Sequence, residues 1–220
     1  LSLNPYYTGP HKGYLEKFVQ IFTTGHPGTA PYENAEIDFL DVSLTDLPFI
    51  ENHPTLSSEL VYYAYPETWF LFFKTKAPPF DDITVRKAIS HAIDKEALSK
   101  VVLRNTAVPA YTMQPPKFPG SADASVRAIQ VYDPERARTL LNDAGYPKGK
   151  GFPQIDFWIG KTNPQINYTA QAVQIMLQNN LGIKTRIKGS EDKIYRDNMY
   201  LSLIHISEPT RRTPISYAVF

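Results

Sequence analysis

The chain has 220 residues, of which 42% are hydrophobic and 20% charged, a composition that excludes a disordered or fibrous protein and provides for a sizeable core. Its 23 Lys and Arg nearly balance its 22 Asp and Glu, and this formal net charge of +1 argues against a nucleic acid or an anionic membrane as partner. Because the chain has no cysteine, it contains no disulfide framework, thiolate metal site or cysteine nucleophile.

The first 60 residues are predicted to form a few short elements. Two extended segments within residues 1–24 are expected around the turn-forming sequence TGPHKG. A short helix is expected over residues 30–35, and a strand over residues 36–42, where apolar and acidic residues alternate. Residues 44–53 are predicted to form another short helix, because Pro54 closes it.

A dense aromatic stretch follows over residues 60–75, LVYYAYPETWFLFFKT. Its aromatic and β-branched side chains predict two strands or one bent strand, interrupted at Pro66. Aromatic residues make up 13% of the whole chain, which indicates a surface able to stack against a ligand.

Two helices are predicted after the double proline at residues 78 and 79. Either Asp81 or Asp82 can cap the first, and Asp94 starts the second. Their buried faces are predicted to be Val85, Ala88, Ile89, Ala92 and Ile93 in the first helix, and Ala97, Leu98, Val101 and Val102 in the second. The prolines of the following loop, residues 105–121, forbid regular structure there, and such loops often carry function.

Residues 133–188 are predicted to alternate helix, strand, helix and strand, the βαβ order of an α/β domain. The first helix is predicted to start at Asp133-Pro134-Glu135 and to end at a left-handed Gly145. The second helix is predicted to start at Asn163-Pro164 and to end at Gly182. Strands are predicted over residues 154–160 and 183–188. The inward faces are predicted to be Leu140, Leu141 and Ala144 in the first helix and Ile166, Ala170, Val173 and Leu177 in the second.

Residues 201–220 differ from the rest, because they follow no amphipathic period. Residues 201–211 match the translation of a transposon sequencing adapter, and residues 215–220 match that of a flow-cell primer in the same register. We therefore expect this tail to be non-native and exclude it from the fold.

Catalysis and metal binding have weak support in the sequence. Glu36 and Asp38 would share one face of a strand about 7 Å apart, a separation that an inverting glycosidase uses, but the solvated face of a strand explains them more simply. The histidines at 11, 26, 53 and 91 lack metal-ligand spacing, and no nucleophile elbow or P-loop is present. We expect no enzymatic activity, metal or cofactor.

Four segments occur in one order: PPFDDITVRKAISHAIDKEAL at 78–98, VPAYTMQPP at 108–116, YDPERARTLLNDAGYPKGKGFP at 132–153 and LGIKTRIK at 181–188. Together they resemble the family 5 extracellular solute-binding proteins, the oligopeptide- and dipeptide-binding subunits of ABC importers. The resemblance extends over about residues 1–199. Arg86 belongs to the resembling motif, and we expect it to act as a structural clamp on Asp81 or Asp82.

The resemblance implies an α/β protein with a two-lobed periplasmic-binding-protein-like (type II) fold, only partly present here. It assigns residues 1–72 to the rear part of lobe I, residues 73–200 to the first part of lobe II, and leaves residues 201–220 as the adapter-derived tail. It also implies a monomer in the periplasm, or anchored outside the cell by a lipid, whose signal segment is missing from this sequence.

The function implied is capture of an extended oligopeptide between the lobes and its delivery to the permease subunits of an ABC importer. The implied ligand-binding residues are Thr68, Trp69 and Phe70, at the crossover between lobes, and Tyr111 in the proline-rich loop. Two alternatives remain. One is a binder of another solute, such as a nickel chelate, haem, a sugar or glutathione, and the other is the sensor domain of a transcriptional regulator.

Overall fold

The computed structural model describes residues 6–10, 15–23, 27–63, 67–115, 118, 121, 127, 129–160, 164–190 and 218–219. The chain divides into two compact units, Leu1–Leu60 and Val61–Phe220. All four implied ligand-binding residues fall in the second unit. The lobe boundary expected after residue 72 stays a prediction.

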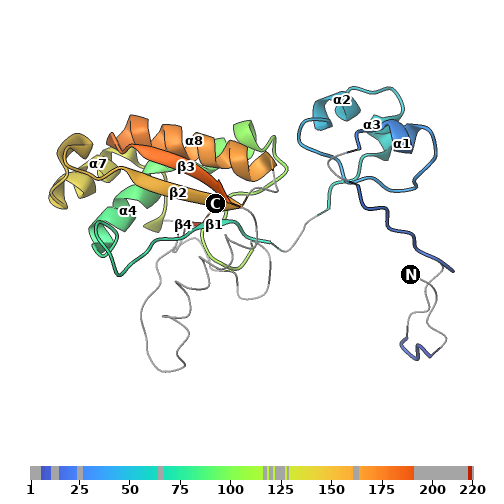
Figure 1. Cartoon of the computed structure of the whole chain (residues 1–220), viewed down its shortest axis with the longest axis horizontal. Coiled ribbons are helices and arrows are strands. Elements are labelled where there is room, and N and C mark those ends of the chain that lie inside the picture. Colours follow the sequence, from blue (N-terminus) through green and yellow to red (C-terminus); the bar gives the residue numbers. More distant parts are fainter. Residues whose placement is uncertain are drawn as a thin grey trace. The chain divides into compact units, whose positions relative to one another are not determined.

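The first unit is built on three short helices, α1 (Ala30–Glu33), α2 (Leu47–Glu51) and α3 (Leu56–Glu59), which Figure 1 shows in blue to cyan. Proline stands in the first turn of α1 and of α2, where its missing N–H costs nothing. The small core of this unit consists of Leu44, Leu47, Ile50 and Leu56. The helices predicted over residues 30–35 and 44–53 are thus confirmed, with tighter bounds.

The strands predicted in this unit are wrong wherever the structure describes the residues. Residues 6–10 and 36–42 form no strand, and within residues 15–23 only Lys17 forms an isolated bridge. Alternation of polar and apolar residues is a local signal, whereas a strand also needs a partner to accept its hydrogen bonds. Phe39, expected on the inner face, is 66% exposed.

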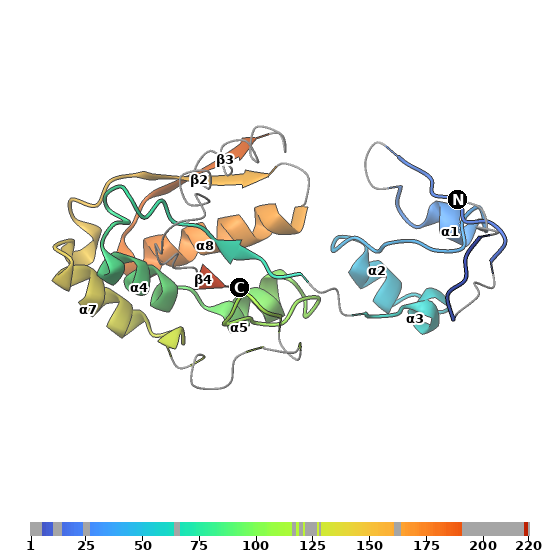
Figure 2. The same cartoon turned by 90° about the horizontal axis from the view of Figure 1, so that it is seen from below.

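The second unit contains the remaining elements, shown from two sides in Figures 1 and 2. They are β1 (Phe70–Leu71), α4 (Ile83–Ala92), α5 (Lys95–Ala97), the π-helix η1 (Leu98–Val102), α7 (Pro134–Asp143), the 3-10 helix η2 (Pro147–Gly149), β2 (Ile155–Gly160), α8 (Pro164–Leu181), β3 (Thr185–Ser190) and β4 (Ala218–Val219).

A parallel βαβ unit forms the centre of this second unit. Strands β2 and β3 pair in parallel, with Ile155 opposite Thr185 and Gly160 opposite Ser190. Helix α8 connects them and runs along the sheet (Figures 1 and 2). The predicted order of helix, strand, helix and strand is therefore confirmed. A second, antiparallel pair joins β1 to β4, which lies within the tail expected to be non-native.

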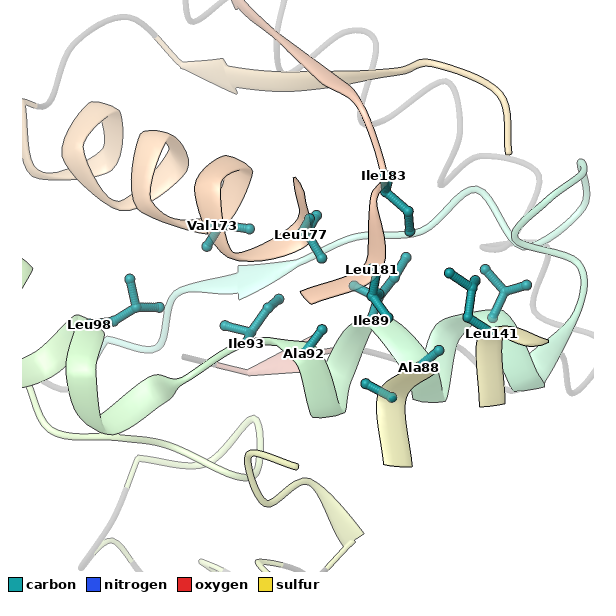
Figure 3. Close-up of a cluster of buried hydrophobic side chains, with 12 residues drawn as sticks. Ala88, Ile89, Ala92, Ile93, Leu98, Leu141, Val173, Leu177, Leu181 and Ile183 are labelled. Carbon is teal, nitrogen blue, oxygen red and sulfur yellow. The ribbon is translucent and has the colours of Figure 1, made fainter. Parts of the chain in front are cut away.

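Helices α4, α7 and α8 enclose one hydrophobic core, shown in Figure 3. Its buried members are Val85, Ala88, Ile89, Ala92, Ile93, Leu98, Ala137, Leu141, Val173, Leu177, Leu181 and Ile183. The faces predicted for α4 and α7 are confirmed. In α8, Ala170, Val173 and Leu177 are buried as expected, and Ile166 is half-buried.

The face predicted for the second helix is partly wrong, because residues 98–102 wind as a π-helix. The N–H of Leu103 donates to the carbonyl of Leu98, five residues earlier, at 2.9 Å. This wider turn places Leu98 and Leu103 on the buried face. Val101, expected inside, is 76% exposed.

The predicted helix caps are confirmed where the structure describes them. The carboxylates of Asp82, Asp94 and Asp133 accept the N–H groups of Thr84, Ala97 and Arg136 at 2.7, 2.9 and 2.9 Å. Gly145 and Gly182 have φ angles of 89° and 72°, the left-handed conformation that ends a helix without a Cβ penalty. Asn163 lies outside the described residues.

Candidate functional site

The first part of the expected site lies on and beside β1. Phe70 stacks edge-to-face on Phe72, with 4.9 Å between ring centroids, while Leu71 and Phe73 pack against the core. Successive side chains of an extended chain point to opposite sides. Phe70 therefore lies on the side of β1 that faces away from the core.

The two residues before β1 are half-buried. Trp69 donates its indole N–H to the carboxylate of Glu67 at 3.1 Å, an exposed hydrogen bond that orients the ring. The Oγ1 atom of Thr68 is buried and lacks a hydrogen-bond partner within the described parts of the chain. A buried hydroxyl without a hydrogen-bond partner destabilises the fold.

Tyr111 stands at the centre of a cluster of polar side chains, here called the Tyr111 cluster, made up of Lys95, Glu96, Tyr111, Arg127 and Gln130. The Lys95 Nζ lies 4.5 Å and the Arg127 Cζ 5.1 Å from the centroid of the Tyr111 ring, within cation–π range. Glu96 pairs with Arg127 at 3.0 Å and accepts a long hydrogen bond of 3.4 Å from the Tyr111 hydroxyl.

Gln130 joins the backbone of Tyr111 to Lys95. Its side-chain N–H donates to the Tyr111 carbonyl at 3.1 Å, and its amide oxygen accepts from the Lys95 Nζ at 2.7 Å. The two bonds use opposite ends of one amide, which defines the orientation of that amide. Lys95 is thereby linked both to the ring and, through Gln130, to the backbone of the same tyrosine.

Within the Tyr111 cluster Lys95 is buried, whereas Glu96 and Arg127 are exposed to solvent. Lys95 is only 3% exposed, and burial lowers its pKa from 10.5 to about 8. Burial is also the main cause that raises the pKa of Tyr111, which Arg127 lowers and Glu96 raises. The Glu96–Arg127 ion pair is largely solvated, so its contribution to the stability of the fold is small.

The segment that carries Gln130 is fastened to the C-terminal end of α4. His91, 2% exposed, has its Nδ1 at 2.7 Å from the carbonyl of Val131, and the N–H of Asp133 donates to the His91 carbonyl at 2.9 Å. Since a carbonyl can only accept, Nδ1 carries the proton. The two hydrogen bonds of His91 therefore hold this segment against α4.

Two of the four expected site residues contact close neighbours in the sequence, since Trp69 contacts Glu67 and Phe70 contacts Phe72. Tyr111 lies in the Tyr111 cluster. Ligand contact by these four residues stays a prediction. The sequence signalled Tyr111 through its loop but not Lys95 or Gln130, because burial of a lysine beside an amide leaves no local pattern.

Arg86 acts as a clamp, but its partners differ from those expected. Its Nη1 donates to the backbone carbonyls of Phe80 and Asp81 at 2.6 and 3.1 Å. The expected ion pair with the carboxylate of Asp81 or Asp82 is not among the salt bridges of the described residues. Arg86 is 8% exposed, so its guanidinium reaches the loop backbone beneath the helix rather than the exposed carboxylates.

The residues considered for catalysis or metal binding lie apart. Glu36 and Asp38 are exposed, lie outside any strand, and Glu36 accepts from Asn34 at 3.4 Å. His53 accepts the N–H of Leu56 at the start of α3. Among the described residues, no group of three His, Asp or Glu side chains could hold a metal ion. Within the same residues, none of the helices combines the length and apolarity of a membrane span.

Comparison with known proteins identifies relatives along almost the whole chain. The family described as bacterial extracellular solute-binding proteins, family 5, middle part, matches residues 1–207. The match thus includes the first seven residues of the tail expected to be non-native.

Two curated relatives and one solved structure show how much of a whole protein the chain represents. Oligopeptide-binding protein OppA of Bacillus subtilis (strain 168) is 26% identical in an alignment of length 207 that covers 91% of this chain and 38% of OppA. The dipeptide-binding protein of Escherichia coli (strain K12) is 32% identical in an alignment of length 206 that covers 81% of this chain and 36% of the relative. The periplasmic oligopeptide-binding protein of Borrelia burgdorferi superposes with a TM-score of 0.61 at 27% identity, covering 77% of this chain and 33% of that one.

All three relatives are named as binding proteins rather than enzymes, and the chain spans between one third and two fifths of their length. The structural likeness agrees with an α/β chain that contains part of the type II solute-binding fold. The chain belongs to family 5 of the bacterial extracellular solute-binding proteins.

Proposed function

We propose that this chain is part of the solute-binding subunit of an ABC importer, which captures an extended oligopeptide between two lobes and delivers it to the permease subunits in the membrane. The family match over residues 1–207 carries the proposal. The protein acts as a monomer on the outer side of the cytoplasmic membrane, either free in the periplasm or held by a lipid anchor. It binds and releases its ligand without chemistry.

Aromatic side chains suit this role, because a ring can pack against a peptide of almost any sequence. Trp69 and Phe70 on one segment and Tyr111 on another supply such rings, each half-buried and therefore partly open to a ligand. The unpaired hydroxyl of Thr68 supplies a polar group for a peptide N–H or carbonyl. The backbone of an extended peptide would be recognised by its regular donors and acceptors, independently of its side chains.

The first experiment is to sequence the source DNA across the codon for Tyr200. Continuation into a Trp-rich segment with an Asp favours a peptide, because a carboxylate can pair with the free amino group of a peptide. Continuation with Arg or His at that place favours another solute. If the DNA encodes Leu201 to Phe220 as printed, the expectation of a non-native tail is wrong.

The second experiment measures binding to the protein encoded by the complete reading frame. Calorimetric titration with tri- to pentapeptides of mixed sequence should give saturable binding, and titration with haem, a nickel chelate or glutathione should not. Binding of one of these solutes in place of the peptides would establish the alternative on the same scaffold. Binding of none of them, together with a helix-turn-helix segment in the reading frame, would indicate the sensor of a transcriptional regulator.

A matched pair of tryptophan variants tests the position of the site. Trp69→Ala should weaken peptide binding roughly tenfold, since one buried aromatic contact is worth about 1.4 kcal/mol or more. Trp158→Ala is the control, because Trp158 is 46% exposed on β2 and its ring contacts Lys188. Equal affinities for both variants would show that Trp69 lies outside the site.

A further inference from the structure

We propose that Lys95 and Gln130 are positioning residues that hold Tyr111 in its ligand-binding orientation, so that the two residues control affinity without touching the ligand. This inference rests on the proposed function and on the expected ligand contact of Tyr111. It assigns a role to Lys95, which lies in the resembling segment 78–98 but is not marked as a buried residue by any local pattern.

The backbone of the loop is fastened before Tyr111 and at Tyr111 itself. The Ser99 hydroxyl donates to the carbonyl of Ala107 at 2.6 Å, and Ala110 is 3% exposed. At Tyr111 itself the carbonyl accepts from Gln130 at 3.1 Å. The main chain is therefore fixed as far as Tyr111. The direction of the Tyr111 ring depends on the groups that contact its face.

Lys95 supplies that contact from the buried side. Its Nζ lies 4.5 Å from the ring centroid and 2.7 Å from the Gln130 amide oxygen. One ammonium group thus connects the ring with the amide that holds the backbone of the same residue. Rotation of the Tyr111 ring away from Lys95 would remove the contact with the ring face and leave a buried cation with one partner fewer.

Hydrophobic packing does not explain why residue 95 is a lysine. Lys95 is 3% exposed, and among the described residues it forms no salt bridge with a carboxylate. A buried cation without a counter-ion destabilises the fold, and Met or Leu would fill the space at lower cost. The lysine is explained by its two contacts, because the hydrogen bond to Gln130 needs a donor and the contact with the face of the Tyr111 ring needs a cation.

The other charged side chains of the Tyr111 cluster, Glu96 and Arg127, are exposed to solvent. Arg127 also approaches the Tyr111 ring, at 5.1 Å, and Glu96 pairs with Arg127. The Arg127 and Glu96 side chains are 59% and 44% exposed, so solvent screens both. Burial raises the pKa of Tyr111 above its usual value, so the phenol is neutral in the range where Lys95 titrates. Loss of charge at Lys95 is thus the protonation change expected between pH 7 and 9.5 inside the cluster.

The test compares Lys95→Met, Lys95→Arg and Lys100→Met in the protein encoded by the complete reading frame. Lys100→Met is the matched control, because Lys100 is exposed on η1. We expect Lys95→Met to raise the Kd for a tripeptide roughly tenfold, while Lys95→Arg, which keeps the cation, stays within about threefold of the wild type. Lys100→Met should bind like the wild type.

A pH profile provides a readout that simple packing would not change. The wild-type Kd should rise more steeply between pH 7 and 9.5 than the Kd of Lys95→Arg, because Lys95 loses its proton while arginine remains charged, and the α-amino group of the tripeptide titrates equally with both proteins. Equally steep profiles for the two proteins, or a Lys95→Met protein with wild-type affinity, would overturn the inference.

Hydrogen exchange separates this inference from the proposed function, because it needs no ligand. Amides of residues 106–115 should exchange faster in Lys95→Met than in the wild type and in Lys100→Met, while α4 and α8 exchange at unchanged rates. Faster exchange in a protein that binds no peptide would contradict the proposed function and support the positioning role. Unchanged exchange in this loop would overturn the positioning role whatever the peptide titration shows.

Discussion

Gly149 and Gly182 approach each other backbone against backbone, which joins the end of η2 to the end of α8. A Cβ atom on Gly182 would lie 2.5 Å from the carbonyl oxygen of Lys148, and one on Gly149 would lie 2.6 Å from that of Leu181. Both residues have positive φ, at 76° and 72°. The approach places the loop before β2 directly against the loop before β3, so it supports the parallel pairing of the two strands.

This contact predicts that Gly182→Ala destabilises the second unit by more than a positive φ alone explains. A left-handed non-glycine residue costs about 1–2 kcal/mol, and the clash with the Lys148 carbonyl adds to it, for a total of about 3 kcal/mol. Urea unfolding monitored by circular dichroism gives the loss. Gly151→Ala is the control, because Gly151 has φ of 80° but open space around its Cβ position. Equal losses for the two variants would contradict a role for the contact.

Removal of the cap at Asp133 should weaken α7. The Asp133 carboxylate accepts the N–H of Arg136 at 2.9 Å, and Asp133→Ala should lower the free energy of unfolding by about 1 kcal/mol. Asp143→Ala at the other end of α7 is the control, since an acid near a helix C-terminus opposes the helix dipole and its removal should cost nothing. Urea unfolding gives the free energy of unfolding of both variants. An unchanged free energy of unfolding in Asp133→Ala would show that the cap is dispensable.

Stability should rise with pH where Lys95 loses its proton. The folded pKa of about 8 lies below the unfolded value of 10.5, so the unfolded chain binds more protons between these values. The group should therefore add roughly 2 kcal/mol to the free energy of unfolding between pH 8 and 9.5.

Urea unfolding across this range should show the rise in the wild type and in Lys100→Met but not in Lys95→Met. At pH 7 the Lys95→Met protein should be at least as stable as the wild type, because it no longer buries a cation. The same dependence in all three proteins would assign it to other groups.

The exposed side of the β2–β3 pair should respond to acid. Hydrogen bonds from Lys188 and then from Arg186 lower the pKa of the Asp156 carboxyl, whose oxygens lie 2.6 and 2.7 Å from the two cations. Since the pKa of Asp156 is lower in the folded than in the unfolded protein, the stabilisation by these two ion pairs is present above about pH 4 and is lost as the pH falls through the folded pKa.

Carbon-detected NMR of the Asp156 carboxyl measures this titration directly. In Lys188→Met its midpoint should move up toward the value of a free aspartate, and in a control, Lys184→Met, it should stay in place. An Asp156 midpoint equal to that of a free aspartate in the wild type would contradict the ion pairs.

Much of the second unit could be predicted from the sequence because its signals are local. Asp82, Asp94 and Asp133 cap helices through hydrogen bonds that span two or three residues. Gly145 and Gly182 end helices through their own backbone conformation. Such features depend little on the rest of the chain, and the structure confirms each of them.

The first unit shows where local signals fail. Residues 36–42 alternate as a strand would, yet they remain irregular. A strand is stabilised only by the neighbour with which it exchanges hydrogen bonds, and alternation says nothing about that neighbour. The π-helix at residues 98–102 is a related case, since its i to i+5 bond changes which side chains share a face.

The sequence by itself determined the family, the βαβ order of residues 133–188 and the helix ends, because motif order and capping chemistry are contained in the residues. Only the tertiary structure decided that Arg86 holds backbone carbonyls and that Lys95 lies buried beside Tyr111 and Gln130. Lys95 and Gln130 are 35 residues apart, and their contact follows from the packing of segments around a common core. Burial of a polar group is a property of that packing, and no local pattern of residues encodes it.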